Sequence, residues 1–206
     1  MDKAINTTYT LLKFLILVAV AIIILFTLIR AGYGNEPFVP GDFLIARERG
    51  ALLAEEIVAL SQASINNLKD IGSQDAAGNY TLGLNLIIEE IARNEEARNK
   101  AISLSKELEA MAIVLPSIKP SEALNVGTQA ILSESQIVQR LINYNDYIYQ
   151  LLNVLRSRFN KIKNVDSGRE IKELIDKMNQ EASSINELNE KYKSLMFEFD
   201  NLTSSQ

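Results

Sequence analysis

The longest uninterrupted apolar run of the chain extends from Phe14 to Ile29 and contains no charged residue. With the apolar residues just before it, the run reaches the roughly 20 residues that cross a hydrocarbon core ~30 Å thick. We therefore predict one transmembrane helix over residues 9–30. Lys13 and Arg30 flank the run and mark the two membrane edges, because a long basic side chain can hold its charge in the interface.

Two alternatives fit the apolar run less well than a membrane span does. A cleaved signal peptide has a shorter apolar core followed by small residues, and Arg30 stands at that place. A buried core helix at this position would need a whole domain around it. The basic residues Lys3 and Lys13 before the run favour a cytoplasmic tail at residues 1–8 and an extracytoplasmic location for everything after Arg30. We therefore expect a single-pass protein of the cell membrane.

After a linker at residues 31–41 that is rich in Gly and Pro, apolar positions recur with the period of an amphipathic α-helix. The pattern predicts four helices, at residues 42–71, 81–115, 121–163 and 167–202. Residues 203–206 are expected to form a disordered tail. Asp42 is the expected N-cap of the first helix, Gly72 its expected end, and Ser167 with Glu170 forms a capping box before the fourth.

The proline positions support these boundaries, because all four prolines fall outside the predicted helices. No segment alternates apolar and polar residues as a half-buried strand does. The predicted fold class is therefore all-α. Long helices joined by short turns pack most simply as an antiparallel up-down-up-down four-helix bundle. The first and third turns would then meet at the membrane-distal tip. The third helix has an apolar stripe wide enough to contact more than one neighbour.

The residue types that are missing restrict the chemistry. The 206 residues include no His and no Cys, which excludes a His general base, a thiolate nucleophile and the usual zinc sites. The net charge of −5 is spread over mixed signs, which disfavours a nucleic-acid partner. An enzyme built on carboxylates such as Glu89, Glu90, Glu95 and Glu96 is a third possibility, but neighbouring acidic residues on a helix usually point into water. We expect no enzymatic activity and no cofactor or metal.

Four polar residues interrupt the apolar seams of the predicted helices, and they are Arg98, Glu134, Asn145 and Glu181. Counted from the connecting turns, Arg98 is expected near Glu134, and Asn145 within about one helical turn of Glu181. One interpretation is a ligand or ion site inside the bundle, with Arg98 binding an anion. The simpler interpretation is a polar layer that fixes the register of the helices.

Two surface features could receive a partner. A basic cluster surrounds the predicted tip and consists of Arg156, Arg158, Lys161, Lys163, Arg169 and Lys172. Acidic residues between them weaken its field, so an ordinary solvated tip explains it better. Tyr149 is the second feature, because an exposed tyrosine suits a protein contact, although a half-buried position on the flank of the helix also fits.

The leading functional hypothesis is a membrane-anchored bundle that acts as a structural or protein-interaction module of the cell envelope. Its expected partners are the lipid bilayer and either another protein or a second copy of the chain. The alternative is a ligand-binding sensor. In layout alone the chain is similar to the extracytoplasmic four-helix bundles of bacterial chemoreceptors, although it carries no residue motif of theirs. That resemblance implies a ligand-binding bundle, and any signal would have to pass through a partner protein because no second span follows Leu202.

Overall fold

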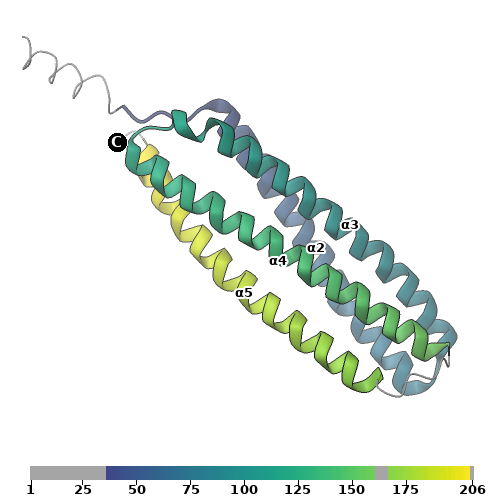
Figure 1. The fold of residues 1–206 in the computed structure, drawn as a ribbon. Coiled ribbons are helices and arrows are strands. Elements are labelled where there is room, and N and C mark those ends of the chain that lie inside the picture. Colours follow the sequence, from purple (N-terminus) through teal and green to yellow (C-terminus); the bar gives the residue numbers. More distant parts are fainter. Residues whose placement is uncertain (1–35, 161–166, 205–206) are drawn as a thin grey trace, which may run out of the picture.

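The structure is a computed structural model that describes residues 36–160 and 167–204. In these residues it is all-α, with four long helices: α2 (Gly41–Ala77), α3 (Tyr80–Val114), α4 (Ser121–Phe159) and α5 (Ser167–Thr203). Consecutive helices run in opposite directions and lie along one another as an elongated bundle (Figure 1). The predicted all-α fold and four-helix bundle are confirmed.

The predicted membrane span, with Lys13 and Arg30 at its edges, lies outside the described residues. Among the helices that the structure describes, none combines the length and the apolar character needed to cross a bilayer.

The first helix is longer than its sequence indicated. α2 continues through Gly72, which is exposed and helical, and ends at Ala77. Gly78 follows in the left-handed conformation, with φ of 73°, and its N–H and that of Asn79 bond back to the last turn. The prediction that Gly72 ends the helix was therefore wrong, because a helix tolerates an interior glycine at a cost of ~1 kcal/mol. Asp42 lies in the first turn and does not cap the helix; Pro40 occupies the N-cap position.

The other helix boundaries agree more closely with the sequence. α3 begins at Tyr80 and passes at Leu115 into a short 3₁₀ turn, η1 (Leu115–Ser117), which contains Pro116. The described part of α5 starts at Ser167, and the predicted capping box with the residues before it stays a prediction. α4 ends at Phe159 rather than at residue 163, since the poor helix former Asn160 follows. The four prolines lie outside the α-helices, as predicted.

The linker before α2 is anchored to the bundle. Phe38 and Lys119 exchange two backbone hydrogen bonds of 3.0 and 3.1 Å, which join the linker to the connection between α3 and α4. Val39 packs against the core beside this bridge. The chain therefore enters the bundle at the end where α5 finishes, and the α2–α3 turn lies at the opposite end with the start of α5 (Figure 1).

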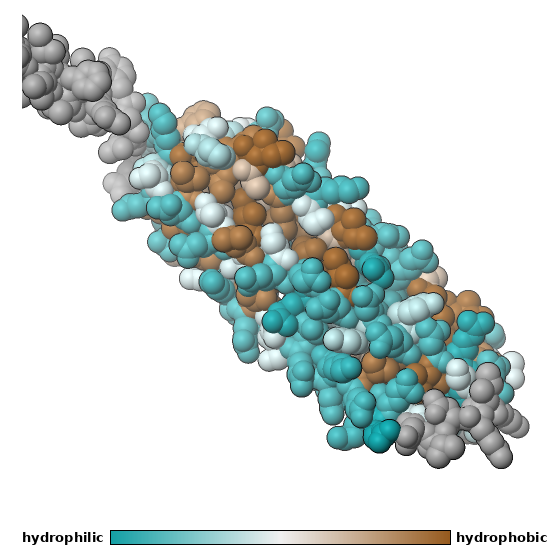
Figure 2. Space-filling view, viewed as in Figure 1, coloured by the Kyte–Doolittle hydropathy of each residue, from teal (hydrophilic) through white to brown (hydrophobic). Residues whose placement is uncertain are grey.

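The core consists of two separate apolar clusters. One surrounds Phe43, Leu108 and Phe199, and the other surrounds Ile87, Ile148 and Phe159 near the opposite end. On the face shown in Figure 2, apolar side chains gather mainly over the half of the bundle that includes the C-terminal end. α4 packs closely against both α3 and α5, as its wide stripe predicted, and α2 packs closely against α3. α2 and α5 do not pack closely together, so one side of the bundle is open.

Candidate functional site: the groove between α2 and α5

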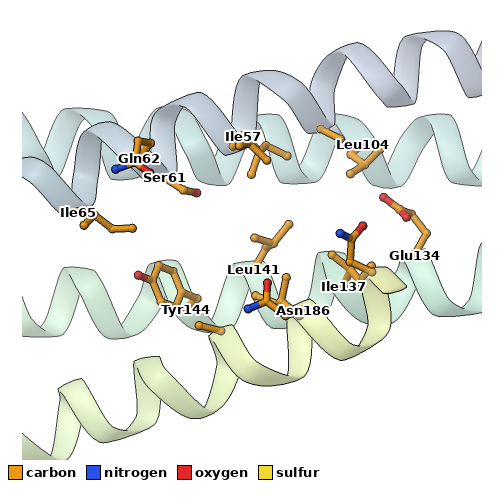
Figure 3. Close-up of a pocket in the computed structure, with 15 residues that line it drawn as sticks. Ile57, Ser61, Gln62, Ile65, Leu104, Glu134, Ile137, Leu141, Tyr144 and Asn186 are labelled. Carbon is orange, nitrogen blue, oxygen red and sulfur yellow. The ribbon is translucent and has the colours of Figure 1, made fainter. Parts of the chain in front are cut away.

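The open side of the bundle forms a groove with two hollows. The first hollow has a volume of about 400 Å³ and lies between α2 and α5, with α4 and Leu104 of α3 as its floor (Figure 3). The second hollow, of about 380 Å³, continues toward the tip between the same helices. Ile65 and Tyr144 line both hollows, so the groove is continuous.

Regular stripes of side chains form the walls of the groove. Along each wall the lining residues are spaced alternately by four and three, which keeps them on one helix face. On α2 the stripe includes Ala54, Val58, Ser61, Ile65, Leu68 and Gly72. On α5 it includes Ile171, Ile175, Met178, Ala182, Ile185 and Asn189. Several members remain open to solvent, with Val58 68% and Ile65 53% exposed. These are the positions at which two helices of a closed bundle would meet.

At one end the groove is closed by contacts that we call the clamp. Phe43 of α2 stacks on Phe199 of α5, with 5.3 Å between ring centroids. Beside them the guanidinium of Arg47 donates two hydrogen bonds, of 2.6 and 2.8 Å, to the carboxylate of Asp200. This hydrogen bonding raises the pKa of Arg47 above its ordinary value. The clamp holds α2 to α5 next to the linker, and the groove begins beyond it.

Glu134 is the one acidic side chain in the first hollow. It projects from α4 into the space near Leu104 and is 8% exposed (Figure 3). Among the described residues, none forms a hydrogen bond or ion pair with its carboxyl group. Burial alone raises the pKa of Glu134 from 4.5 to about 7. The charge of Glu134 also acts on Tyr192 of α5. Burial is the main cause that raises the pKa of Tyr192 to about 12, and the charge of Glu134 is the second.

The other predicted polar residues do not join Glu134. Arg98 pairs with Asp146 at 2.8 Å and both are substantially exposed, so the expectation that Arg98 lies near Glu134 was wrong. Arg98 lies on an exposed face of α3, whose buried stripe passes instead through Asn94, Ala97 and Ala101. Asn145 is buried and its backbone carbonyl accepts a hydrogen bond of 2.9 Å from Asn94. Glu181 pairs with Arg140 at 2.9 Å.

A polar layer does cross the bundle, but its centre is a residue that the sequence analysis placed in water. Glu90 is fully buried between α2 and α3. It accepts hydrogen bonds from Ser64, Asn67 and Arg93, with the Asn67 Nδ2 to Glu90 Oε2 distance at 2.9 Å. The layer of Ser64, Asn67, Glu90, Asn94 and Asn145 separates the two apolar clusters. Helical spacing was the signal for it, because Glu90 and Asn94 continue the stripe of Ile87 and Ala97.

The predicted basic tip is largely neutralised where the structure describes it. Arg158 pairs with Asp75 at 3.1 Å, Arg169 with Glu173 at 3.9 Å and Lys172 with Asp176 at 3.6 Å. Arg156 is exposed, and Lys161 and Lys163 lie outside the described residues. Tyr149 is 50% exposed on α4, which is compatible with either interpretation of that residue.

The groove therefore combines an apolar wall on each side with the buried carboxyl group of Glu134 in its first hollow. Within residues 36–160 and 167–204, no three acidic side chains converge as a metal site would require. The first hollow can hold an apolar molecule and offers it a single acidic contact. No protein-family model, curated protein or solved structure matches this chain.

Proposed function

We propose that the chain is a single-pass membrane protein whose extracytoplasmic bundle binds an apolar ligand in the groove and reports it through a partner protein. The observation that supports this most directly is the uncovered groove, with apolar walls and a buried, unpaired Glu134 in its floor. Its first hollow, about 400 Å³, is in the size range of small-molecule sites. Buried carboxyls with a strongly raised pKa gather at functional sites.

The clamp gives such a site a route for the signal. α2 follows the linker and α5 ends beside it, and the clamp joins the two helices at that end. A ligand in contact with both helices would favour one distance between them over others. This change in the population of bundle shapes is what a partner at the membrane could detect.

Thiol protection tests ligand binding, because the chain has no cysteine of its own. Asn186 lines the first hollow and is exposed, so Asn186→Cys places a reactive thiol at its rim. Lys191→Cys, on a different face of α5, is the matched control. With the full chain in phosphatidylcholine nanodiscs, dodecanol should slow maleimide labelling at position 186 and leave position 191 unchanged. Equal labelling with and without dodecanol at position 186 would contradict ligand binding.

The same Asn186→Cys variant tests the topology in intact cells. A membrane-impermeant maleimide should label it before lysis, because we propose that the bundle is extracytoplasmic. Labelling only after lysis would place the bundle in the cytoplasm.

A second candidate, the structural or protein-interaction module, is favoured by exposed apolar residues on the outer side of α2 and α3. Lys100 pairs with Glu56 at 2.7 Å, which shows the register of these antiparallel helices. In that register Leu52 and Ile102, 57% and 39% exposed, come at similar heights. Exposed apolar clusters of this kind often mark protein contacts. Light scattering coupled to size exclusion in detergent distinguishes the candidates: a defined oligomer supports self-association, and a monomer contradicts it.

A further inference from the structure

We propose that the ligand of the groove is an amphiphile with one unbranched apolar chain and a primary ammonium group, whose ammonium pairs with Glu134. This inference rests on the proposed function, since it names the chemical class of the ligand for the same groove. It is carried by the shape of the first hollow and by the charges of the residues around it.

The shape of the hollow suits a single chain of carbon atoms. On α2 the lining extends from Ala54 to Ile65, which corresponds to ~16 Å at ~1.5 Å per residue. A volume of about 400 Å³ over that length gives a mean cross-section of ~25 Å². Nonbonded carbons pack ~4 Å apart, so one alkyl chain fills such a channel. An α-helix, with a diameter of ~10 Å, could insert only its side chains.

The second hollow makes room for a longer chain. It begins at Ile65 and Tyr144, where the first one ends, and its other lining residues are mostly apolar, such as Leu68, Leu151 and Met178. Its charged lining residues, Asp75 and Arg158, pair with each other near the tip. Glu134 lies near the clamp end of the first hollow, and from there the floor continues through Ile137 and Leu141 to Tyr144. A head group at Glu134 would therefore direct its chain toward the tip along an apolar floor.

The charges select the sign of the head group. None of the residues that line the first hollow is Lys or Arg, so a carboxylate or phosphate would find no cation there. The polar groups at the walls are the neutral side chains of Ser61, Gln62, Asn186 and Asn189. Glu134 is the only lining residue that can be charged near neutral pH, and an ammonium would supply the hydrogen bonds that its carboxylate lacks.

The surroundings of Glu134 leave that pairing available. From α5 it faces Tyr192, whose pKa of about 12 keeps the phenol neutral. Arg47 of α2 is held by Asp200, and the α3 residue in the lining is the apolar Leu104. An alkyl ammonium ion would therefore be the only positive charge in the hollow.

The test compares three probes with the same chain: dodecylamine, dodecanol and dodecanoate. With ~1.5 Å bonds, an extended dodecyl chain is ~15 Å long, which matches the first hollow. Protection of Asn186→Cys is titrated with each probe in phosphatidylcholine nanodiscs at about pH 8, where the Glu134 carboxyl is ionised. The titrations are repeated with Glu134→Gln added, which keeps the shape of the side chain and removes its charge.

We expect dodecylamine to protect at a concentration ~10-fold lower than dodecanol, as a charge-assisted hydrogen bond predicts, and dodecanoate to protect least. Glu134→Gln should abolish the advantage of the amine and leave protection by dodecanol unchanged, which also shows that the groove of the variant is intact. Equal protection by the amine and the alcohol, or an amine advantage that survives in Glu134→Gln, overturns the proposed ligand class while ligand binding in the groove stands. Protection by none of the probes overturns the proposed function as well.

Discussion

Replacing Glu134 by glutamine should stabilise the protein at about pH 8 but not below about pH 4.5. The pKa of Glu134 is about 7 in the folded chain against 4.5 for an ordinary glutamate. Between these values the folded state holds a proton that the unfolded state has released, so its free energy of unfolding falls as the pH rises. Each pKa unit corresponds to ~1.4 kcal/mol, so the full loss is about 3 kcal/mol. Glutamine does not titrate, so the Glu134→Gln variant does not lose this free energy of unfolding.

The assay is urea unfolding of the full chain in a nonionic detergent, followed by far-ultraviolet circular dichroism. Below about pH 4.5 the native chain and Glu134→Gln should unfold at similar urea concentrations, because the carboxyl is protonated in both states. At about pH 8 the variant should be more stable by about 3 kcal/mol. Glu109→Gln removes an exposed carboxyl of α3 and serves as the control, with an expected difference within ~0.5 kcal/mol.

Either of two results would refute this reasoning. A difference between the native chain and Glu134→Gln that stays constant with pH would mean that the carboxyl does not titrate in this range. A native chain that gains stability relative to the variant as the pH rises would mean that its carboxylate has a partner in the folded protein.

Four further substitutions test the packing by the same urea assay. Gly83→Ala should destabilise the protein by ~2 kcal/mol, because its new methyl group would overlap the ring of Phe159. Gly72→Ala, whose methyl group would meet nothing nearby, should stabilise it by up to ~1 kcal/mol. Equal effects of the two substitutions would contradict the close contact at Gly83. Glu90→Ala should cost ~3 kcal/mol, because it removes the acceptor of three hydrogen bonds, two of them from the buried side chains of Ser64 and Asn67. A loss under ~1 kcal/mol would show that water replaces the carboxylate. Arg47→Ala should cost ~1 kcal/mol, less in high salt, because the pair that it breaks is partly exposed; a larger, salt-independent loss would contradict that account.

The sequence predicted the helices well because their boundaries depend on local residues. Pro116 marked the end of α3 without reference to the rest of the chain. The end of the first helix was missed since Gly72 and Gly78 are equally plausible stops, and only the backbone shows that Gly78 has a positive φ. Local sequence cannot settle that choice, because it depends on whether the last turn is held by contacts with the next helix.

The site was predictable only in part, because it depends on which helices fail to meet. Glu134 was singled out from the sequence as a break in an apolar seam, and it is the buried carboxyl of the groove. The expectation that Arg98 lies beside Glu134 was wrong, because Arg98 lies on an exposed face of α3, next to the buried stripe and not on it. Glu90 was overlooked because its charge suggested solvent, although its spacing placed it on the buried stripe. The opening between α2 and α5 had no sequence signal, since an apolar stripe looks the same whether it is covered or not.

Opposing free energies explain how such a groove can persist. Closing α2 onto α5 would cover Val58, Ile65 and Ile175, and full burial of side chains of this size contributes ~1.5–3 kcal/mol each. The same movement would remove the remaining water from the carboxyl of Glu134, and a buried charge without a partner costs several kcal/mol. A cationic head group reverses the second contribution by supplying the partner, and its chain supplies the apolar cover that the walls lack. Glu134 thus lowers the stability of the empty bundle above pH 7, and the same residue would favour the occupied bundle most.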